Sequence, residues 1–143
     1  MTIERQESSP EVELPSSGVW WIHGAGQRAV TVDSILHSVD ASLVLGERDR
    51  FAARLCIDEA ITNACEHAGV SPERPIEIEL HVASPRWALR VRDAGPGHTR
   101  DGEAGGALDE GGRGLRFIAG YCERVVVSEG GRTITLWGRA EER

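Results

Sequence analysis

One helical segment, residues 57–68, constrains what this chain can fold into more than any other part of it. Its apolar side chains recur at offsets of four, three and four residues, which is the pattern of an α-helix packed on a core. These side chains are Ile57, Ile61, Ala64 and Ala68. Glu59, Asn63 and His67 follow their own four-residue spacing, so successive groups turn by only about 40° and form one polar stripe. The stripe predicts either an ordinary solvated helix face or a site that combines a carboxylate, an amide and an imidazole.

A glycine-rich turn follows an alternating stretch further along the chain. Apolar and charged residues alternate over residues 87–92, which predicts a strand with one solvent-exposed and one buried face. The strand runs into Asp93, and Gly95 and Gly97 come directly after it. A carboxylate therefore lies where the strand leaves the sheet, and the two glycines let the backbone approach a ligand closely. The same residues suit a tight turn without any ligand, so both interpretations stay open.

A second glycine motif precedes a predicted short helix over residues 116–121. It reads Gly111-Gly112-Arg113-Gly114-Leu115. Glycines at a helix N-terminus leave unpaired backbone amides at the positive end of the helix dipole, an arrangement suited to phosphate. A flexible loop is the alternative for these glycines taken alone.

All sixteen basic residues are arginine, and the chain contains no lysine. This excludes mechanisms that need a lysine amine, such as a Walker A phosphate loop, a protein-kinase phosphate-pairing lysine and a Schiff-base nucleophile. A phosphate ligand would have to be held by backbone amides, by a metal, or by the guanidinium of Arg113 or Arg116. Arg113 lies between two glycines and is the better candidate, while solvated charges at a helix start remain the alternative for both.

Charge, length and cysteine content narrow the class of protein. A net charge of -7 argues against non-specific binding to nucleic acid or to anionic membranes. A length of 143 residues predicts one domain, expected over residues 18–143 after a flexible polar tail at 1–17. Cys56, Cys65 and Cys122 lack metal-site spacing and predict reduced, mostly buried thiols in a cytoplasmic protein. Neither a signal peptide nor a membrane-spanning stretch is expected.

The pattern along the chain predicts helices and strands in a definite order. A first strand is expected near residues 19–22, followed by helices over 29–45 and 47–68, and by strands near 76–82, 87–92, 123–128 and 133–139. Gly46 is expected to end the first helix, and Glu129-Gly130-Gly131 to turn the last hairpin. This order predicts helices in one layer over a mixed or antiparallel sheet.

Together these motifs resemble those of the GHKL, or Bergerat-fold, ATPases, and within them the small anti-sigma factor serine kinases, over roughly residues 28–139. The matching motifs are Glu59-x-x-x-Asn63-Ala64-x-x-His67 for the N box, Asp93-x-Gly95-x-Gly97 for the adenine-binding glycine box, and Gly112-x-Gly114-Leu115 for the second glycine box. The segment Asp58-Glu59-Ala60-Ile61-Thr62-Asn63 is especially similar in sequence to the corresponding segment of the anti-sigma kinases. The resemblance implies a Bergerat fold, an α+β two-layer sandwich with helices packed on one face of a mixed, largely antiparallel sheet.

The resemblance also implies ATP and magnesium as cofactors and a role for individual residues. Asn63 would coordinate the magnesium ion that bridges the phosphates, and Glu59 would be the general base. Asp93 would hold the adenine amino group, with Gly95 and Gly97 shaping the pocket. The other nucleotide-binding residues would be Gly112, Arg113, Gly114 and Leu115 in the second glycine box and Thr133 or Thr135 on the last strand.

In function, the resemblance implies an ATP-dependent protein serine/threonine kinase. It would phosphorylate a serine of an anti-anti-sigma partner with a STAS domain, and it would sequester a sigma factor. A homodimer is expected, with no direct nucleic-acid or membrane partner.

The segment between the glycine motifs departs from the family pattern. Residue 98 is His, and residues 98–110 carry four acids against the single Arg100. In this family the segment forms a lid over the nucleotide, where acids repel a triphosphate unless they face solvent or a partner. A non-catalytic module that acts by partner sequestration is therefore one alternative. The catalytic domain of a split histidine kinase is another.

Overall fold

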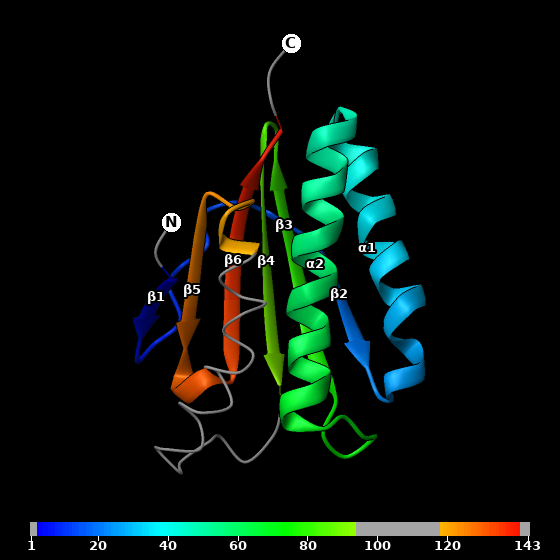
Figure 1. The fold of residues 1–143 in the computed structure, drawn as a ribbon, viewed down its shortest axis with the longest axis vertical. Coiled ribbons are helices and arrows are strands. Elements are labelled where there is room, and N and C mark those ends of the chain that lie inside the picture. Colours follow the sequence, from blue (N-terminus) through cyan, green and yellow to red (C-terminus); the bar gives the residue numbers. More distant parts are fainter. Residues whose placement is uncertain (1–2, 94–117, 141–143) are drawn as a thin grey trace.

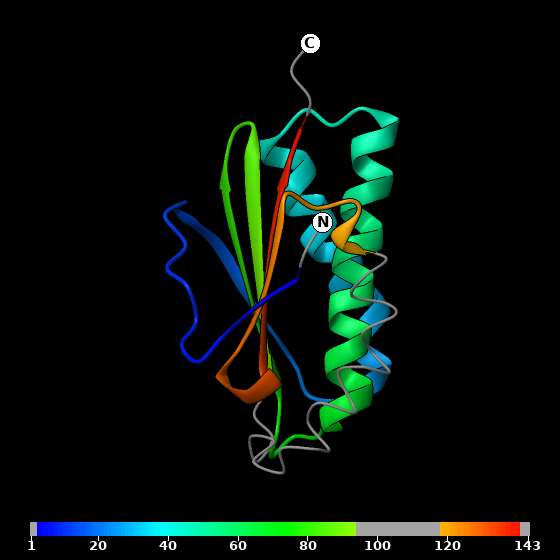
Figure 2. The same ribbon diagram turned by 60° about the vertical axis from the view of Figure 1, so that its left-hand side comes forward.

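The computed structural model describes residues 3–93 and 118–140. Within these residues, two α-helices lie on one face of a six-stranded sheet (Figures 1 and 2). The helices are α1 (Arg28–Ser42) and α2 (Glu47–Ala68), and the strands are β1 (Ile3–Gln6), β2 (Ser16–Ile22), β3 (Ile76–Ala83), β4 (Arg86–Asp93), β5 (Arg124–Ser128) and β6 (Thr133–Arg139). The predicted α+β two-layer architecture is confirmed.

The sheet is mixed and largely antiparallel, as the resemblance implies. Its strand order is β1-β5-β6-β4-β3-β2. All neighbouring strands pair antiparallel except β1, which pairs parallel with β5. The β5–β6 hairpin turns at residues 129–131, where Glu129, Gly130 and Gly131 all have positive φ. The predicted turn is thus confirmed, and its two glycines supply the backbone conformation that the turn requires.

Strand alternation divides the sheet into a helix-facing side and an outer side. On β4, Trp87, Leu89 and Val91 belong to the core that α1 and α2 cover. Arg90 and Arg92 alternate with them and join the polar contacts of the outer side. The helix-facing side chains of β3, β5 and β6 are similarly apolar and buried. Two amphipathic helices thus bury one sheet face, which is where most of the apolar side chains lie.

Helix α2 has the bounds that the sequence predicts, whereas α1 ends three residues earlier than expected. Leu43 adopts an extended conformation (φ -129°, ψ 146°) and ends α1. Gly46, expected to stop the first helix, is in fact the N-cap residue of α2. The two helices are therefore joined by an extended link, and buried Leu43 belongs to that link.

Residues 3–15 pack on the rest of the sheet, although the sequence predicts a flexible tail over residues 1–17. Residues 3–6 form β1, in register with β5 from Ile3 opposite Val125 to Gln6 opposite Ser128. Residues 7–15, here called the strap, then cross the outer side of the sheet to reach β2 at the opposite edge (Figure 2). A polar, proline-containing segment is ordered here because other strands supply its hydrogen-bond partners.

Hydrogen bonds hold the strap at both ends. Near β5, Glu129 N donates to Glu7 O at 3.0 Å, and the hydroxyls of Ser9 and Ser128 lie 2.9 Å apart. Near β3, Val82 N donates to Pro15 O at 3.1 Å. Between these ends, Val12 and Leu14 pack on a small apolar cluster of Ala88, Val126 and Trp137. The strap therefore gives the outer side of the sheet a small core of its own.

No helix among the described residues has the length and apolar character needed to cross a membrane.

Candidate functional site

Asn63 is a buried polar residue on α2. Its side chain is only 5% exposed, and it lies in the turn that follows buried Ala60 and Ile61. Within the described residues, its Nδ2 has no hydrogen-bond partner. A buried donor without a partner costs about 1–3 kcal/mol, so such groups usually mark a place where something else binds. At Asn63 the polar stripe is therefore not the solvated helix face that the sequence left open as an alternative.

Glu59 lies one helical turn before Asn63, on the same face of α2. Its side chain is half-buried. Burial raises the pKa of its carboxyl group, and the neighbouring charges of Asp58 and Glu66 raise it further. A carboxylate whose pKa is raised toward neutrality takes up a proton more readily than an exposed glutamate does, as a general base requires.

Arg28 fixes the part of α2 that carries these two residues. It is the first residue of α1, and its Nη1 donates to Asp58 Oδ1 at 2.6 Å and to Thr62 Oγ1 at 3.2 Å. Because Asp58 directly precedes Glu59 and Thr62 directly precedes Asn63 in the sequence, these bonds join α1 to α2 beside both site residues. Sequence reasoning missed Arg28, since a single arginine at a helix start carries no local signal of a partner thirty residues away.

Asp93 ends β4 as a buried carboxylate, 4% exposed. Its backbone N donates to Arg132 O at 2.9 Å. Strand alternation places Asp93 on the same side as Val91, which faces the helices. The C-terminal ends of β4 and α2 lie at the same end of the domain (Figure 1). The fold thus brings Glu59, Asn63 and Asp93 to one side of the sheet and toward one end of it.

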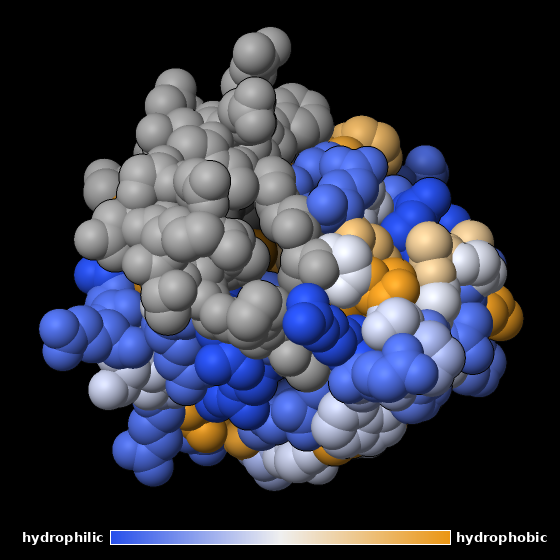
Figure 3. Space-filling view, turned by 90° about the horizontal axis from the view of Figure 1, so that it is seen from below, coloured by the Kyte–Doolittle hydropathy of each residue, from blue (hydrophilic) through white to orange (hydrophobic). Residues whose placement is uncertain are grey.

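Figure 3 looks onto this end of the molecule. Where described residues are visible, the surface is mostly hydrophilic, with apolar side chains in separate small groups.

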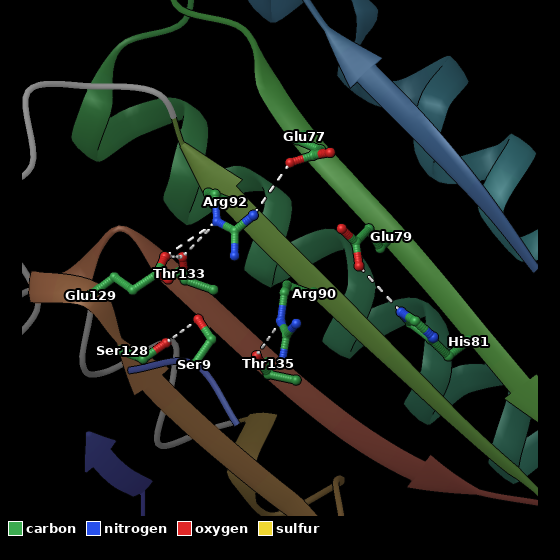
Figure 4. A network of polar contacts seen from close by, with 10 residues as sticks. All are labelled: Ser9, Glu77, Glu79, His81, Arg90, Arg92, Ser128, Glu129, Thr133 and Thr135. Carbon is green, nitrogen blue, oxygen red and sulfur yellow. Dashed lines mark hydrogen bonds and ion pairs between the residues drawn. The ribbon is translucent and has the colours of Figure 1, made fainter. Parts of the chain in front are cut away.

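Thr133 and Thr135 lie on the other side of the sheet (Figure 4). Thr133 pairs with Arg92 in the register of β4 and β6, and its hydroxyl donates to Glu129 Oε1 at 2.5 Å. Thr135 Oγ1 accepts a hydrogen bond from Arg90 Nε at 3.2 Å. Because paired residues of an antiparallel sheet share a face, neither threonine is brought to the face of Asp93. The resemblance predicts that Thr133 or Thr135 lies near adenine together with Asp93. The structure instead places both threonines on the opposite face of the sheet from Asp93.

Several predicted site residues lie outside the described residues. They are Gly95, Gly97, Gly112, Arg113, Gly114 and Leu115. His67 lies within α2, but its side chain is not among those described.

Arg132 is a further residue that sequence reasoning missed. Its Nε is buried and, within the described residues, has no hydrogen-bond partner. Its backbone oxygen already binds the amide of Asp93. The backbone of Arg132 thus contacts that of Asp93, and its side-chain Nε remains able to donate a hydrogen bond. Its only sequence signal is an arginine directly after the Gly130-Gly131 turn.

The carboxamide of Asn63 on α2 fits a nucleotide with bound magnesium. A carboxamide offers the kind of oxygen that magnesium binds, and this ion usually keeps water and phosphate oxygens as its other ligands. In the described part of the chain no group of three or more His, Cys, Asp or Glu side chains could hold a metal. An ion at Asn63 would thus depend on the ligand's own phosphates, and Asn63 Nδ2 remains able to donate a hydrogen bond to that ligand.

Comparison with known proteins identifies one matching family of domains. The sequence matches the histidine kinase-like ATPase domain over residues 25–137. The match begins just before α1 and ends within β6, so it includes Glu59, Asn63 and Asp93. Among curated proteins, none matches the sequence.

Proposed function

The chain belongs to the histidine kinase-like ATPase family, and from this premise we propose that it is an ATP-dependent serine kinase that also acts as an anti-sigma factor. Its substrate would be a serine of an anti-anti-sigma protein with a STAS domain, and its second partner a sigma factor. The assignment to the anti-sigma kinases within this family is supported by the sequence of residues 58–63, which is especially similar to that of the anti-sigma kinases. We further propose that it works as a homodimer in the cytoplasm.

One observation carries the catalytic part of this proposal. A buried amide with an unpartnered donor, Asn63, lies one helical turn from Glu59, whose pKa burial raises. An ATPase site needs a residue such as Asn63 to hold the metal and the phosphates. A kinase additionally needs a residue such as Glu59 to accept the proton of the attacking hydroxyl.

Each residue then has a separate task. Asn63 holds the magnesium ion, which when bound offsets the phosphate charges. Asp93, buried at the end of β4, accepts a hydrogen bond from the amino group of adenine. Glu59 accepts the proton of the attacking serine hydroxyl. Most of the rate enhancement of phosphoryl transfer comes from positioning and electrostatic stabilisation, so Glu59 is expected to contribute less than the nucleotide site as a whole.

Calorimetric titration of magnesium and ATP tests the nucleotide site. We expect saturable binding by the wild type and strongly weakened binding by Asn63→Ala. Arg48→Ala is the matched control, because Arg48 is exposed in the first turn of the same helix. Equal affinity of Asn63→Ala and wild type would refute the role of Asn63. Absence of binding by folded wild type would leave partner sequestration without nucleotide as the function.

Phosphorylation of a STAS-domain protein tests the kinase assignment. Glu59→Gln should lower phosphotransfer by about 10²–10⁴-fold, the range for a lost general base, while ATP binding persists. Glu47→Gln is the control, since Glu47 is an exposed glutamate in the first turn of the same helix. Undiminished transfer by Glu59→Gln would refute the assignment of the base. Acid-labile phosphohistidine in place of acid-stable phosphoserine would indicate a split histidine kinase.

A further inference from the structure

Two cysteines that are distant in the sequence meet in the core. Cys56 lies on α2, and Cys122 lies just before β5. Both are free thiols, and they are 0% and 5% exposed. Cys122 Sγ donates to Cys56 Sγ across 2.9 Å, and Cys56 Sγ donates to Ile118 O at 3.7 Å. The third cysteine, Cys65, is half-buried and lies nine residues further along α2, roughly 13 Å from Cys56 along the helix axis.

The thiol pair joins the helix that carries Glu59 and Asn63 to the chain just before β5. Cys56 is three residues before Glu59 and two helical turns before Asn63 on the same helix. Cys122 lies seven residues after Leu115, the last residue of the second glycine motif. A bond between the sulfurs would therefore link the helix of the candidate base directly to the chain that leads out of that motif.

We propose that Cys56 and Cys122 are a redox modification site, at which a hydroperoxide converts the thiol pair into an intramolecular disulfide. One sulfur attacks the peroxide oxygen, which breaks the O–O bond, gives a sulfenic acid and releases water or an alcohol. The second sulfur attacks the sulfenic sulfur, and the hydroxyl leaves as water. The two sulfurs together lose two electrons and two protons, and the peroxide is reduced by the same two electrons.

The surroundings accommodate the disulfide with little rearrangement. The sulfur atoms must approach by only about 0.9 Å to reach the usual bond length near 2.05 Å. Oxidation removes the S–H group that Cys56 donates to Ile118 O. That carbonyl still accepts a hydrogen bond from Tyr121 N at 2.8 Å, so oxidation leaves no buried acceptor without a partner.

The reduced pair is protected rather than reactive at rest. The hydrogen bond to Cys56, together with burial, raises the pKa of the Cys122 thiol well above its usual range. The thiolate is the attacking form, so oxidation is expected to be slow and to depend on opening of the core around the pair. Cys65 is less buried but has no thiol neighbour, so it serves as an internal comparison.

The test uses the full chain without nucleotide, so its outcome is independent of the proposed kinase activity. No arginine lies between Cys56 and Cys65, and a tryptic peptide therefore carries both. For this reason the Cys65→Ser variant is used beside the wild type. Each protein is reduced, desalted, incubated with hydrogen peroxide, then denatured and alkylated for mass spectrometry.

We expect the free thiols to fall from three to one in wild type and from two to none in Cys65→Ser. A tryptic peptide pair linked through Cys56 and Cys122 should appear, and dithiothreitol should restore both thiols. Cys122→Ala should form no such link. If this variant does not fold, the thiol count of Cys65→Ser still decides. Two alkylated thiols in Cys65→Ser after the same peroxide exposure would overturn the proposal. Irreversible sulfinic acids without a linked peptide would do the same.

Discussion

Gly138 is the position where adding one methyl group should disturb the core most directly. It lies in β6 opposite Trp87 of β4. A Cβ atom at Gly138 would fall 2.4 Å from both Cε2 and Cζ2 of the Trp87 indole. The indole is 3% exposed and belongs to the core cluster, so neighbouring side chains prevent it from simply moving aside. Gly138→Ala therefore forces overpacking.

The expected cost of Gly138→Ala is about 1–3 kcal/mol, the usual range for an extra methyl group in a well-packed core. The φ angle of Gly138 lies outside the left-handed region, so backbone strain adds nothing. Where there is room, Gly→Ala instead stabilises by about 0.4–1 kcal/mol, because the unfolded chain loses freedom. For a domain of this size, the midpoint of thermal unfolding should fall by roughly 4 to 12 °C.

Chemical and thermal unfolding followed by circular dichroism measure this effect. Gly26→Ala is the matched control, since a Cβ at Gly26 meets no atom within 4 Å, and it should be neutral or stabilise the protein by up to about 1 kcal/mol. Trp87→Phe should partly rescue Gly138→Ala in a double-mutant cycle, because the smaller ring leaves room for the methyl group. A neutral or stabilising Gly138→Ala, or the absence of coupling to Trp87, would refute the steric reasoning.

Two further predictions concern the outer side of the sheet. The hydrogen bond from Thr133 lowers the pKa of Glu129 against the opposing effect of burial, with help from the charge of Arg92. The folded state therefore binds this proton less readily than the unfolded state. Glu129 should thus stabilise the protein above pH 4.5. The difference in the free energy of unfolding between wild type and Glu129→Gln should disappear as pH falls through the lowered pKa of Glu129. Denaturation curves at several pH values that show a constant difference would contradict this prediction. Replacing Val12 and Leu14 with serine should expose Trp137 and lower the unfolding midpoint. Glu11→Ser changes an exposed neighbour in the strap and should leave the exposure of Trp137 and the midpoint unchanged. Tryptophan fluorescence during denaturant titration measures both quantities.

Local pattern predicted those elements whose signals are themselves local. Helix α2 has its predicted bounds because its apolar period lies within the segment. Strand β6 also has its predicted bounds, and the turn before it follows from Gly130 and Gly131. The sequence placed Asn63 on a polar stripe but could not tell that the stripe is buried there, because burial depends on which other elements α2 contacts.

Features that depend on distant partners were not predictable in the same way. The strap has the composition of a disordered tail, and only Val12 and Leu14 hint at a buried face. Its partner Trp137 lies at the opposite end of the chain. Similarly, the last strand offered two threonines, but only the register with β4 shows that both face away from Asp93. Long-range pairing decides such questions, and no window of the sequence contains it.

The parallel pairing of β1 with β5 has a consequence for synthesis on the ribosome. Glu4 and Arg124, which are joined by hydrogen bonds of 2.8 and 3.0 Å between these strands, are 120 residues apart. At translation rates of about 5–20 residues per second, the first strand of the nascent chain waits roughly 6 to 24 seconds before its partner exists. Until then, neither β1 nor the strap has its native binding surface. This edge of the sheet can be completed only after β5, which ends at Ser128, has been translated.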